Sequence, residues 1–193
     1  MMAAVLIEGP AVEPVSLAEV KEHLRVDGPD EEPLIVALIT TARLTIEHLA
    51  GLALVTQRWA VLFDAWPDAS AIELPVAPVA SVDAVRVYDE ADLASVIDPA
   101  EYFADLASRP ARLVRRGQQG WPAPGRVANG IEIELTAGFG ATPEAVPETL
   151  RWAMLMLVGH WFETRAAVEA NTQLRHVPLA VQAVLGPYRK VRL

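Results

Sequence analysis

Residues 152–162 read WAMLMLVGHWF, and this stretch decides how the rest of the chain is interpreted. It suits an α-helix, contains no charged residue and places large apolar side chains on every side of that helix. A helix that covers one core has a single apolar stripe, so this helix must be covered on more than one face. Its eleven residues are far fewer than the ~20 apolar residues of a membrane span. We therefore expect a helix with two packing partners, in a protein that does not enter a membrane.

The composition favours a protein that buries surface between subunits. The chain has 193 residues, enough for one domain with a substantial core. Hydrophobic residues make up 52% and charged residues 21%, which is an apolar balance for a monomer of this size. Cysteine is absent, which excludes disulfides and thiolate metal sites. Residues 1–10 lack the basic and long apolar regions of a secretory signal, so we expect a cytoplasmic protein.

The charges are sorted along the chain. The net charge is −9; residues 1–50 carry nine acids and three bases, and residues 61–105 carry ten acids and one base. Residues 106–126 carry five arginines and no acid. A nucleic-acid-binding domain usually has a net basic footprint, and this chain does not.

The N-terminal region is predicted to form two helices. Ser16 is a suitable N-cap for a short helix, with Glu19 at the reciprocal capping-box position. Residues 27–30 read DGPD and interrupt it, and a longer helix follows from near Asp30 to a C-cap at Gly51. Its apolar residues recur at helical spacing: Leu34, Leu38, Ala42, Ile46 and Leu49.

The middle of the chain, residues 54–137, changes to the period of β-strands. Apolar and other residues alternate from Trp59 to Phe63, at residues 85–87 and most clearly at residues 131–135. Prolines between these runs suit a small antiparallel sheet or partial barrel with long hairpins. We expect an α+β fold in one domain, residues 1–193: a helical body formed by N- and C-terminal helices, about 16–51 and 143–185, with an inserted antiparallel β lobe.

The C-terminal region is predicted to return to helix. The apolar helix follows Pro143 and Pro147, and residues 166–177 have weak periodicity typical of a loop. A short helix over residues 178–185 is expected to end at Gly186-Pro187. A basic tail, residues 186–193, then completes the sequence.

One candidate chemistry is metal binding. His160 and Glu163 lie three residues apart, so a helix would place them on one face, and Glu47 with His48 from the earlier helix could add ligands. Carboxylate-bridged metal sites in helical bundles need a Glu-x-x-His motif from each of two helices, and neither helix has one in that order. A partly buried histidine bonded to a neighbour is the simpler interpretation. A small cytoplasmic metal-binding protein or enzyme stays open as the alternative function.

Other catalytic motifs are weaker. Residues 138–140 read GFG between a strand and a helix, but no Lys-Ser/Thr follows and Pro143 and Pro147 remove backbone donors. No Gly-x-Ser-x-Gly motif is present. We expect no catalytic residue, no metal and no cofactor.

The arginine cluster is a candidate for contact with a partner. Its members are Arg109, Arg112, Arg115, Arg116 and Arg126, and Trp121 lies among them. A basic loop with an aromatic residue could bind phosphates and stack on a base. It could equally pair with the acids of residues 61–105, within the chain or in an adjacent copy, or be solvated. Pairing between copies would join two different patches, which closes into a ring when the rotation permits.

Short segments along the chain occur in a characteristic order. In the predicted helical part, they are residues 14–27, 30–32, 38–39, 42–43, 46–47, Gly51, 146–147, 160–163 with Arg165, and 184–189. In the strand-rich part, they are Thr56-Gln57, Trp59, Leu74-Pro75, Pro78-Val79, Ser81-Val82, Trp121-Pro122 and residues 136–140. These segments and their order resemble head-tail connector (adaptor) proteins of tailed bacteriophages and gene transfer agents. The similarity spans nearly the whole chain.

The resemblance implies a non-enzymatic adaptor that assembles in the bacterial cytoplasm and becomes part of a phage or gene-transfer-agent particle. It implies a ring of copies, expected to be twelve, under the portal protein, with a stopper or tail-completion protein below. DNA would pass through the channel without specific binding, and acids facing that channel would repel its phosphates.

Two groups of residues are candidates for the interfaces. Trp152, Met156 and Trp161 are expected to pack either against a neighbouring copy or in the chain's own core. The tail is expected to dock on the portal rather than stay free in solution. Its candidate residues are Tyr188, Arg189, Lys190, Val191, Arg192 and Leu193.

Overall fold

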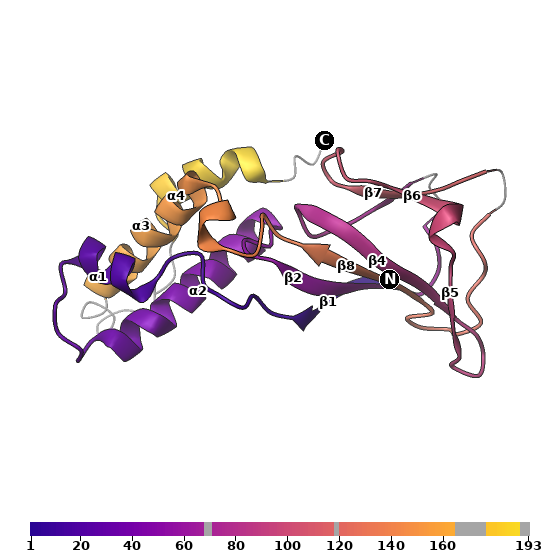
Figure 1. Ribbon diagram of the computed structural model, residues 1–193, viewed down its shortest axis with the longest axis horizontal. Helices are drawn as coiled ribbons and strands as arrows, with labels where there is room; N and C mark the ends of the chain where they lie inside the picture. Colours follow the sequence, from indigo (N-terminus) through magenta and orange to yellow (C-terminus); the bar gives the residue numbers. More distant parts are fainter. Residues whose placement is uncertain (68–70, 118–119, 165–176, 190–193) are drawn as a thin grey trace. The chain divides into compact units, whose positions relative to one another are not determined.

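The computed structural model describes residues 1–67, 71–117, 120–164 and 177–189, and its chain path is drawn in Figure 1. The chain divides into two compact units, each with its own network of contacts. One unit is formed by residues 1–10 and 56–139 and contains every strand found in the described residues. The other is formed by residues 11–55 and 140–193 and contains the α-helices. The predicted α+β class is confirmed.

The described residues of the β unit form two antiparallel sheets. The larger sheet has the order β1-β2-β8-β4-β5, from β1 (Met2–Glu8), β2 (Gln57–Phe63), β8 (Ile131–Ala137), β4 (Val79–Tyr88) and β5 (Ala94–Val96). The smaller sheet has the order β3-β7-β6, from β3 (Ala71–Glu73), β7 (Arg112–Arg115) and β6 (Tyr102–Asp105). A 3₁₀ turn, η1 (Pro99–Glu101), joins β5 to β6.

The register of the larger sheet explains its core. Val61 on β2 lies opposite Ile133 on β8, which lies opposite Val85 on β4, and all three side chains are fully buried. Residues one position along each strand face the other side, because side chains alternate. The alternation expected at residues 131–135 therefore marks the core face of the central strand.

Strand β1 was missed by the sequence analysis, which assigned no element before Ser16. The strand pairs with β2, more than fifty residues later in the chain, from Met2 opposite Phe63 to Leu6 opposite Trp59. Its sequence is apolar on both sides, so it lacks the alternation that identifies a half-buried strand. The β lobe consequently includes residues 1–10 in addition to the segment expected.

The helical unit contains four α-helices within its described residues: α1 (Leu17–Leu24), α2 (Glu32–Ala50), α3 (Glu148–Thr164) and α4 (Leu179–Leu185). Two 3₁₀ turns, η2 (Pro143–Ala145) and η4 (Gly186–Tyr188), precede α3 and follow α4. The start of α1 and the end of α2 have the capping residues that the sequence predicts. The Ser16 hydroxyl accepts a hydrogen bond from the Glu19 amide at 3.2 Å, and the Glu19 carboxylate accepts one from the Ser16 amide at 2.7 Å. Gly51 ends α2 with a φ of 67°, in the left-handed region that favours glycine.

Helix α3 contains the apolar stretch of residues 152–162. It contacts α1, α2 and α4, and Leu150, Met154 and Leu157 on its covered face are fully buried. Three helices of its own unit therefore account for that face. Of the expected loop over residues 166–177, all but Val177 lie outside the described residues.

Helix α2 is long and apolar enough to cross a membrane by length and composition alone. Within the helical unit it contacts α1, α3 and α4, and Ile35, Ile39 and Ile46 are buried. The core helix of a soluble protein has the same composition, and we interpret α2 as such a helix.

A buried arginine fixes α2 to its neighbouring segments. The Arg43 Nε donates to Glu13 Oε2 at 2.8 Å and the Nη1 donates to Glu47 Oε2 at 3.0 Å. Glu47 Oε1 accepts a further bond from the Leu54 amide at 2.9 Å, and the Thr40 hydroxyl donates to Glu13 Oε1 at 2.9 Å. The network joins the segment before α1, the middle of α2 and the segment after it.

Replacing Arg43 by methionine should lower the free energy of unfolding of the helical unit by about 3–5 kcal/mol, because two carboxylates lose their shared cation and Glu47 is buried. Chemical denaturation followed by circular dichroism measures the loss. The matched control is the triple variant R43M/E13Q/E47Q, whose neutral amides should restore part of it. A loss below about 1 kcal/mol for R43M would contradict the role given to Arg43.

Candidate interaction surfaces

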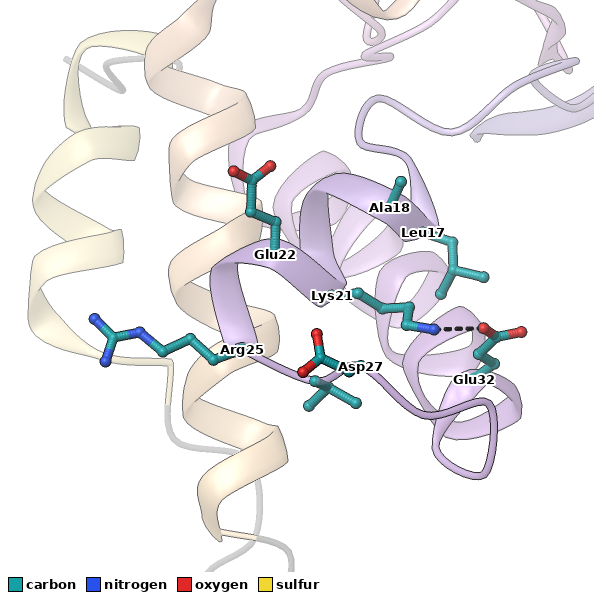
Figure 2. A pocket seen from close by; sticks show the side chains of 8 residues that line it. Leu17, Ala18, Lys21, Glu22, Arg25, Asp27 and Glu32 are labelled. Atoms are coloured by element: carbon teal, nitrogen blue, oxygen red, sulfur yellow. Dashed lines mark hydrogen bonds and ion pairs between the residues drawn. The ribbon is translucent and has the colours of Figure 1, made fainter.

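A shallow pocket lies between α1 and the start of α2 in the helical unit (Figure 2). Lys21 Nζ spans it to Glu32 Oε1 at 2.5 Å, and Arg25 extends in the opposite direction from Lys21. Leu17, Ala18, Glu22, Val26 and Asp27 complete the lining. The pocket is open and charged, which suits a contact surface better than an enclosed substrate site.

The three candidate interface residues of α3 differ in how far they are exposed. Trp152 is 51% exposed and meets His23 of α1 edge-on, with ring centroids 5.5 Å apart. Met156 and Trp161 are half-buried. Trp152 therefore does not fill the core of its own unit and presents an apolar surface.

Three of the five arginines in the cluster form ion pairs within the β unit. Arg112 Nη2 lies 2.5 Å from Asp105 Oδ2, Arg126 Nε lies 2.8 Å from Asp92 Oδ1, and Arg115 pairs with Glu101. The acids all belong to the acidic segment 61–105. Hydrogen bonds from Ser108 and Arg112 lower the pKa of Asp105 to about 2. Three arginines of the basic segment are thus paired with acids of the same chain.

Aromatic residues support the same arginines. The guanidinium of Arg126 lies 4.5 Å from the ring centroid of Tyr88, and that of Arg115 lies 5.2 Å from the ring of Trp121. Trp121 stacks on Trp66 with centroids 4.4 Å apart. Trp66 therefore covers one face of the Trp121 ring, a face on which a nucleic-acid base could otherwise stack.

The two remaining arginines differ from each other. Arg116 Nε donates to the Tyr102 carbonyl oxygen at 2.8 Å, and its guanidinium lies 5.7 Å from the ring of Phe103. Arg109 is exposed. These two residues keep more of their charge available to a partner than the three paired ones.

A second group of charges lies on the outer face of the larger sheet. Arg86 Nη1 donates to Glu132 Oε1 at 2.6 Å and to Glu134 Oε2 at 2.8 Å, and Arg58 also pairs with Glu134. The Tyr88 hydroxyl donates to Glu132 at 2.9 Å, which raises the pKa of Tyr88. The hydrogen bond from Arg86, with Arg58 beside it, holds the pKa of Glu134 below its ordinary value.

The C-terminal segment begins on the helical unit. The hydroxyl groups of Tyr188 and Thr149 lie 2.9 Å apart, which attaches the end of η4 to α3. Arg189 is half-buried. The predicted tail residues Lys190, Val191, Arg192 and Leu193 lie outside the described residues.

The four candidate metal ligands do not form a site in the described part of the chain. Glu47 is engaged by Arg43 and by the Leu54 amide, whereas His48 and Glu163 are exposed. His160 is half-buried. No group of three or more His, Asp or Glu residues suited to a metal occurs among the residues that the structure describes.

Comparison with known families decides the assignment. A model of the head completion protein family matches residues 13–191, which is nearly the whole chain. The chain belongs to the head completion protein family. The expected kinship with head-tail connectors is confirmed, and the protein is a structural head-tail adaptor. Comparison with curated protein sequences gives no significant match.

Solved structures of gene transfer agent (GTA) particles share the fold. A chain in the neck of an empty GTA particle, computed with C6 symmetry, is 26% identical with a TM-score of 0.83, over 99% of this chain and 97% of that chain. A chain in the neck of a native GTA particle, computed with C12 symmetry, is 27% identical with a TM-score of 0.74, over 98% and 97%. A chain in the virion of a native GTA particle shares the fold at 24% identity and a TM-score of 0.81, over 98% and 96%.

Sequence reasoning missed two features of this family member. The Arg43 network joins residues thirty positions apart, and the sheet-face network joins Arg58 to a partner seventy-six positions away. The spacing of Arg43 and Glu47, four residues apart on a helix, was a signal for one of these pairs. The sheet-face pairs had no signal, because they depend on which strands become neighbours.

The sheet-face network should make stability depend on pH. The pKa of Glu134 is lower in the folded state, so its contribution is complete above the ordinary value of 4.5 and is lost as the pH falls through the folded value. At pH 7, E134Q should lower the free energy of unfolding by about 1–3 kcal/mol, and this difference should shrink at pH 3. Urea denaturation at the two pH values measures it.

E148Q is the matched control, because the Glu148 side chain is 88% exposed and lies 3.5 Å from Arg151. It should change stability by less than about 0.5 kcal/mol at either pH. An equal loss for E134Q at pH 7 and pH 3 would mean that the charge of Glu134 is not what stabilises the sheet.

Proposed function

We propose that this chain is the repeating subunit of a ring, of twelve copies, that lies beneath the portal and joins the DNA-filled capsid to the stopper or tail-completion protein. The subunits assemble in the bacterial cytoplasm before the particle is complete. DNA passes through the ring without specific binding. The function is carried by interfaces and not by catalysis.

One observation carries this proposal. The chain corresponds along nearly all of its length, and along nearly all of theirs, to chains in GTA necks computed with C6 and C12 symmetry. The arrangement of twelve copies is compatible with both symmetries.

The charges support passage of DNA without capture. The net charge of the chain is −9, and Arg112, Arg115 and Arg126 are paired with acids of the same chain. Strong binding to duplex DNA depends on free cations that replace the counterions of the phosphates. A ring of acidic subunits with paired arginines would offer few of them.

The tail is proposed to bind the portal, and this gives the test of the function. Electron microscopy of the purified chain mixed with its portal protein should reveal a ring of twelve adaptor copies on the portal. Removing residues 189–193 keeps the bond between Tyr188 and Thr149, so the helical unit should still fold. Portal binding in a pull-down should fall at least tenfold.

A full-length control separates charge from length. R189A/K190A/R192A keeps every residue of the tail but removes its charges, and an intermediate loss of binding is expected if the cations contribute. Absence of any ring from the full chain with portal would contradict the proposed function. Unchanged binding by the truncated chain would contradict the role of the tail alone.

Trp152 is proposed to contact the neighbouring copy. Because it is half exposed, W152S should lower the free energy of unfolding by only about 1–2 kcal/mol, from the buried part of the ring and its contact with His23. The same change should weaken ring assembly on the portal by about thirtyfold, the scale of an interface hot spot of ~2 kcal/mol. Thermal unfolding and assembly measured by light scattering distinguish the two effects.

M154A is the contrasting variant, because Met154 lies on the same helix and is fully buried. It should lower stability by about 2–5 kcal/mol through the cavity it leaves. Normal assembly by W152S would place Trp152 outside the interface.

A further inference from the structure

Strand β1 forms one edge of the larger sheet and is exposed along its whole length. All seven residues, Met2–Glu8, are exposed, although six of them are apolar. Val5 is 48% and Leu6 43% exposed, and their side chains face opposite sides of the sheet. An apolar strand of this kind is typical of one that is covered on both faces, and a long exposed apolar edge pairs readily with another strand.

The hydrogen bonds of β1 identify which backbone groups are free. The Asp64 amide donates to the Met1 carbonyl oxygen, so Met1 and Asp64 form a hydrogen-bonded pair. Hydrogen-bonded and non-bonded pairs alternate in an antiparallel ladder. The amide and carbonyl groups of Met2, Ala4 and Leu6 therefore point away from β2, toward the open edge.

Strand β5 forms the opposite edge of the same sheet. The Ile97 amide donates to Val85 O at 2.8 Å, and the Asp89 amide donates to Leu93 O at 3.1 Å. Ile97 with Val85 and Leu93 with Asp89 are therefore hydrogen-bonded pairs of the ladder. By the same alternation, the backbone groups of Ala94 and Val96 point outward. Val96 is 63% and Leu93 66% exposed, so this edge is also apolar.

We propose that β1 of one subunit adds to the edge of β5 in the neighbouring subunit, so that one sheet continues from copy to copy around the ring. The inference rests on the ring of the proposed function. Its physical basis is that the two open edges are different surfaces at opposite ends of one sheet. A contact between two different surfaces is head-to-tail and closes under rotation, as a ring requires. Addition of a strand to an exposed edge is a known mode of recognition.

The topology fixes the direction of the added strand. Each neighbouring pair in the larger sheet is antiparallel, so β1 and β5, the first and fifth strands, run in the same direction. Rotation about a ring axis keeps the direction of a strand along that axis. The contact between β5 and the neighbour's β1 is therefore parallel, and the core face of one sheet continues as the core face of the next.

A pocket beside β5 provides a place for the incoming side chains. Its volume is about 660 Å³, and Ser95, Val96, Ile97 and Arg115 are among its lining residues. Ser95 pairs with the buried Val87, so Ser95 and Ile97 lie on the core face of β5. Side chains of an added strand that lie on this face would face the pocket.

Disulfide cross-linking tests the contact, because the chain contains no cysteine. The register places Ala4 and Leu6 on the same sheet face as Ser95, whereas Val5 lies on the other face. Rings assembled on the portal from A4C/S95C or L6C/S95C chains should give a ladder of covalent oligomers after oxidation. V5C/S95C chains, the matched control, should give at least tenfold less.

A second pair of variants tests the same edge without cysteine. A4P removes an outward amide that β2 does not use, so the β unit should fold while ring assembly falls at least tenfold. A4V keeps that amide and should assemble normally.

The single variant A4C should stay monomeric after oxidation, and covalent dimers would instead indicate contact between two β1 strands and overturn the proposal.

The outcomes distinguish this inference from the function on which it rests. If the unaltered chain forms rings with the portal but neither cysteine pair cross-links, or A4P assembles normally, the strand addition is wrong and the ring remains. If the unaltered chain forms no ring with the portal, both the strand addition and the proposed function are contradicted.

Discussion

The helical unit depends on the ion pairs of one buried arginine. Arg43 lies inside the unit and bonds two carboxylates, Glu13 before α1 and Glu47 on its own helix. Burying a charge is costly unless it is paired and its hydrogen bonds are satisfied, so arrangements that separate Arg43 from Glu13 or Glu47 are disfavoured. The apolar contacts of α2 and α3 are less selective, because many arrangements bury similar areas. The network therefore contributes specificity to a unit whose stability comes from apolar packing.

In the β unit, the ion pairs are spread over several arginines and are not centred on one buried residue. These arginines pair with acids from other segments of the sequence, on the outer face of the larger sheet and around β6 and β7. This pairing occurs within one chain, so the separation of charge along the sequence is not by itself evidence of contact between copies. The stronger indications of assembly are apolar: the exposed edges β1 and β5 and the exposed ring of Trp152.

Much of the fold could be predicted from local chemistry. The capping box at Ser16, the left-handed C-cap at Gly51 and the strand at residues 131–135 each depend on a few adjacent residues, and each occurs as expected. Strand β1 could not be identified in this way, since its apolar residues do not alternate. The surroundings of Glu47 could not be predicted either: its carboxylate is chemically suited to bind a metal, but its neighbours in space are Arg43 and the Leu54 amide.

The sequence by itself determined the class of the fold, the ends of the helices, the core face of the central strand and the resemblance to head-tail connectors. These properties depend on residues close together in the sequence, and the propensities and spacing of those residues are enough to predict them. Only the tertiary structure decided which acid neutralises which arginine, that the N-terminal residues form an edge of the larger sheet, and that Trp152 stays exposed. Each of these depends on segments that are distant in the chain and become neighbours only when the backbone has folded.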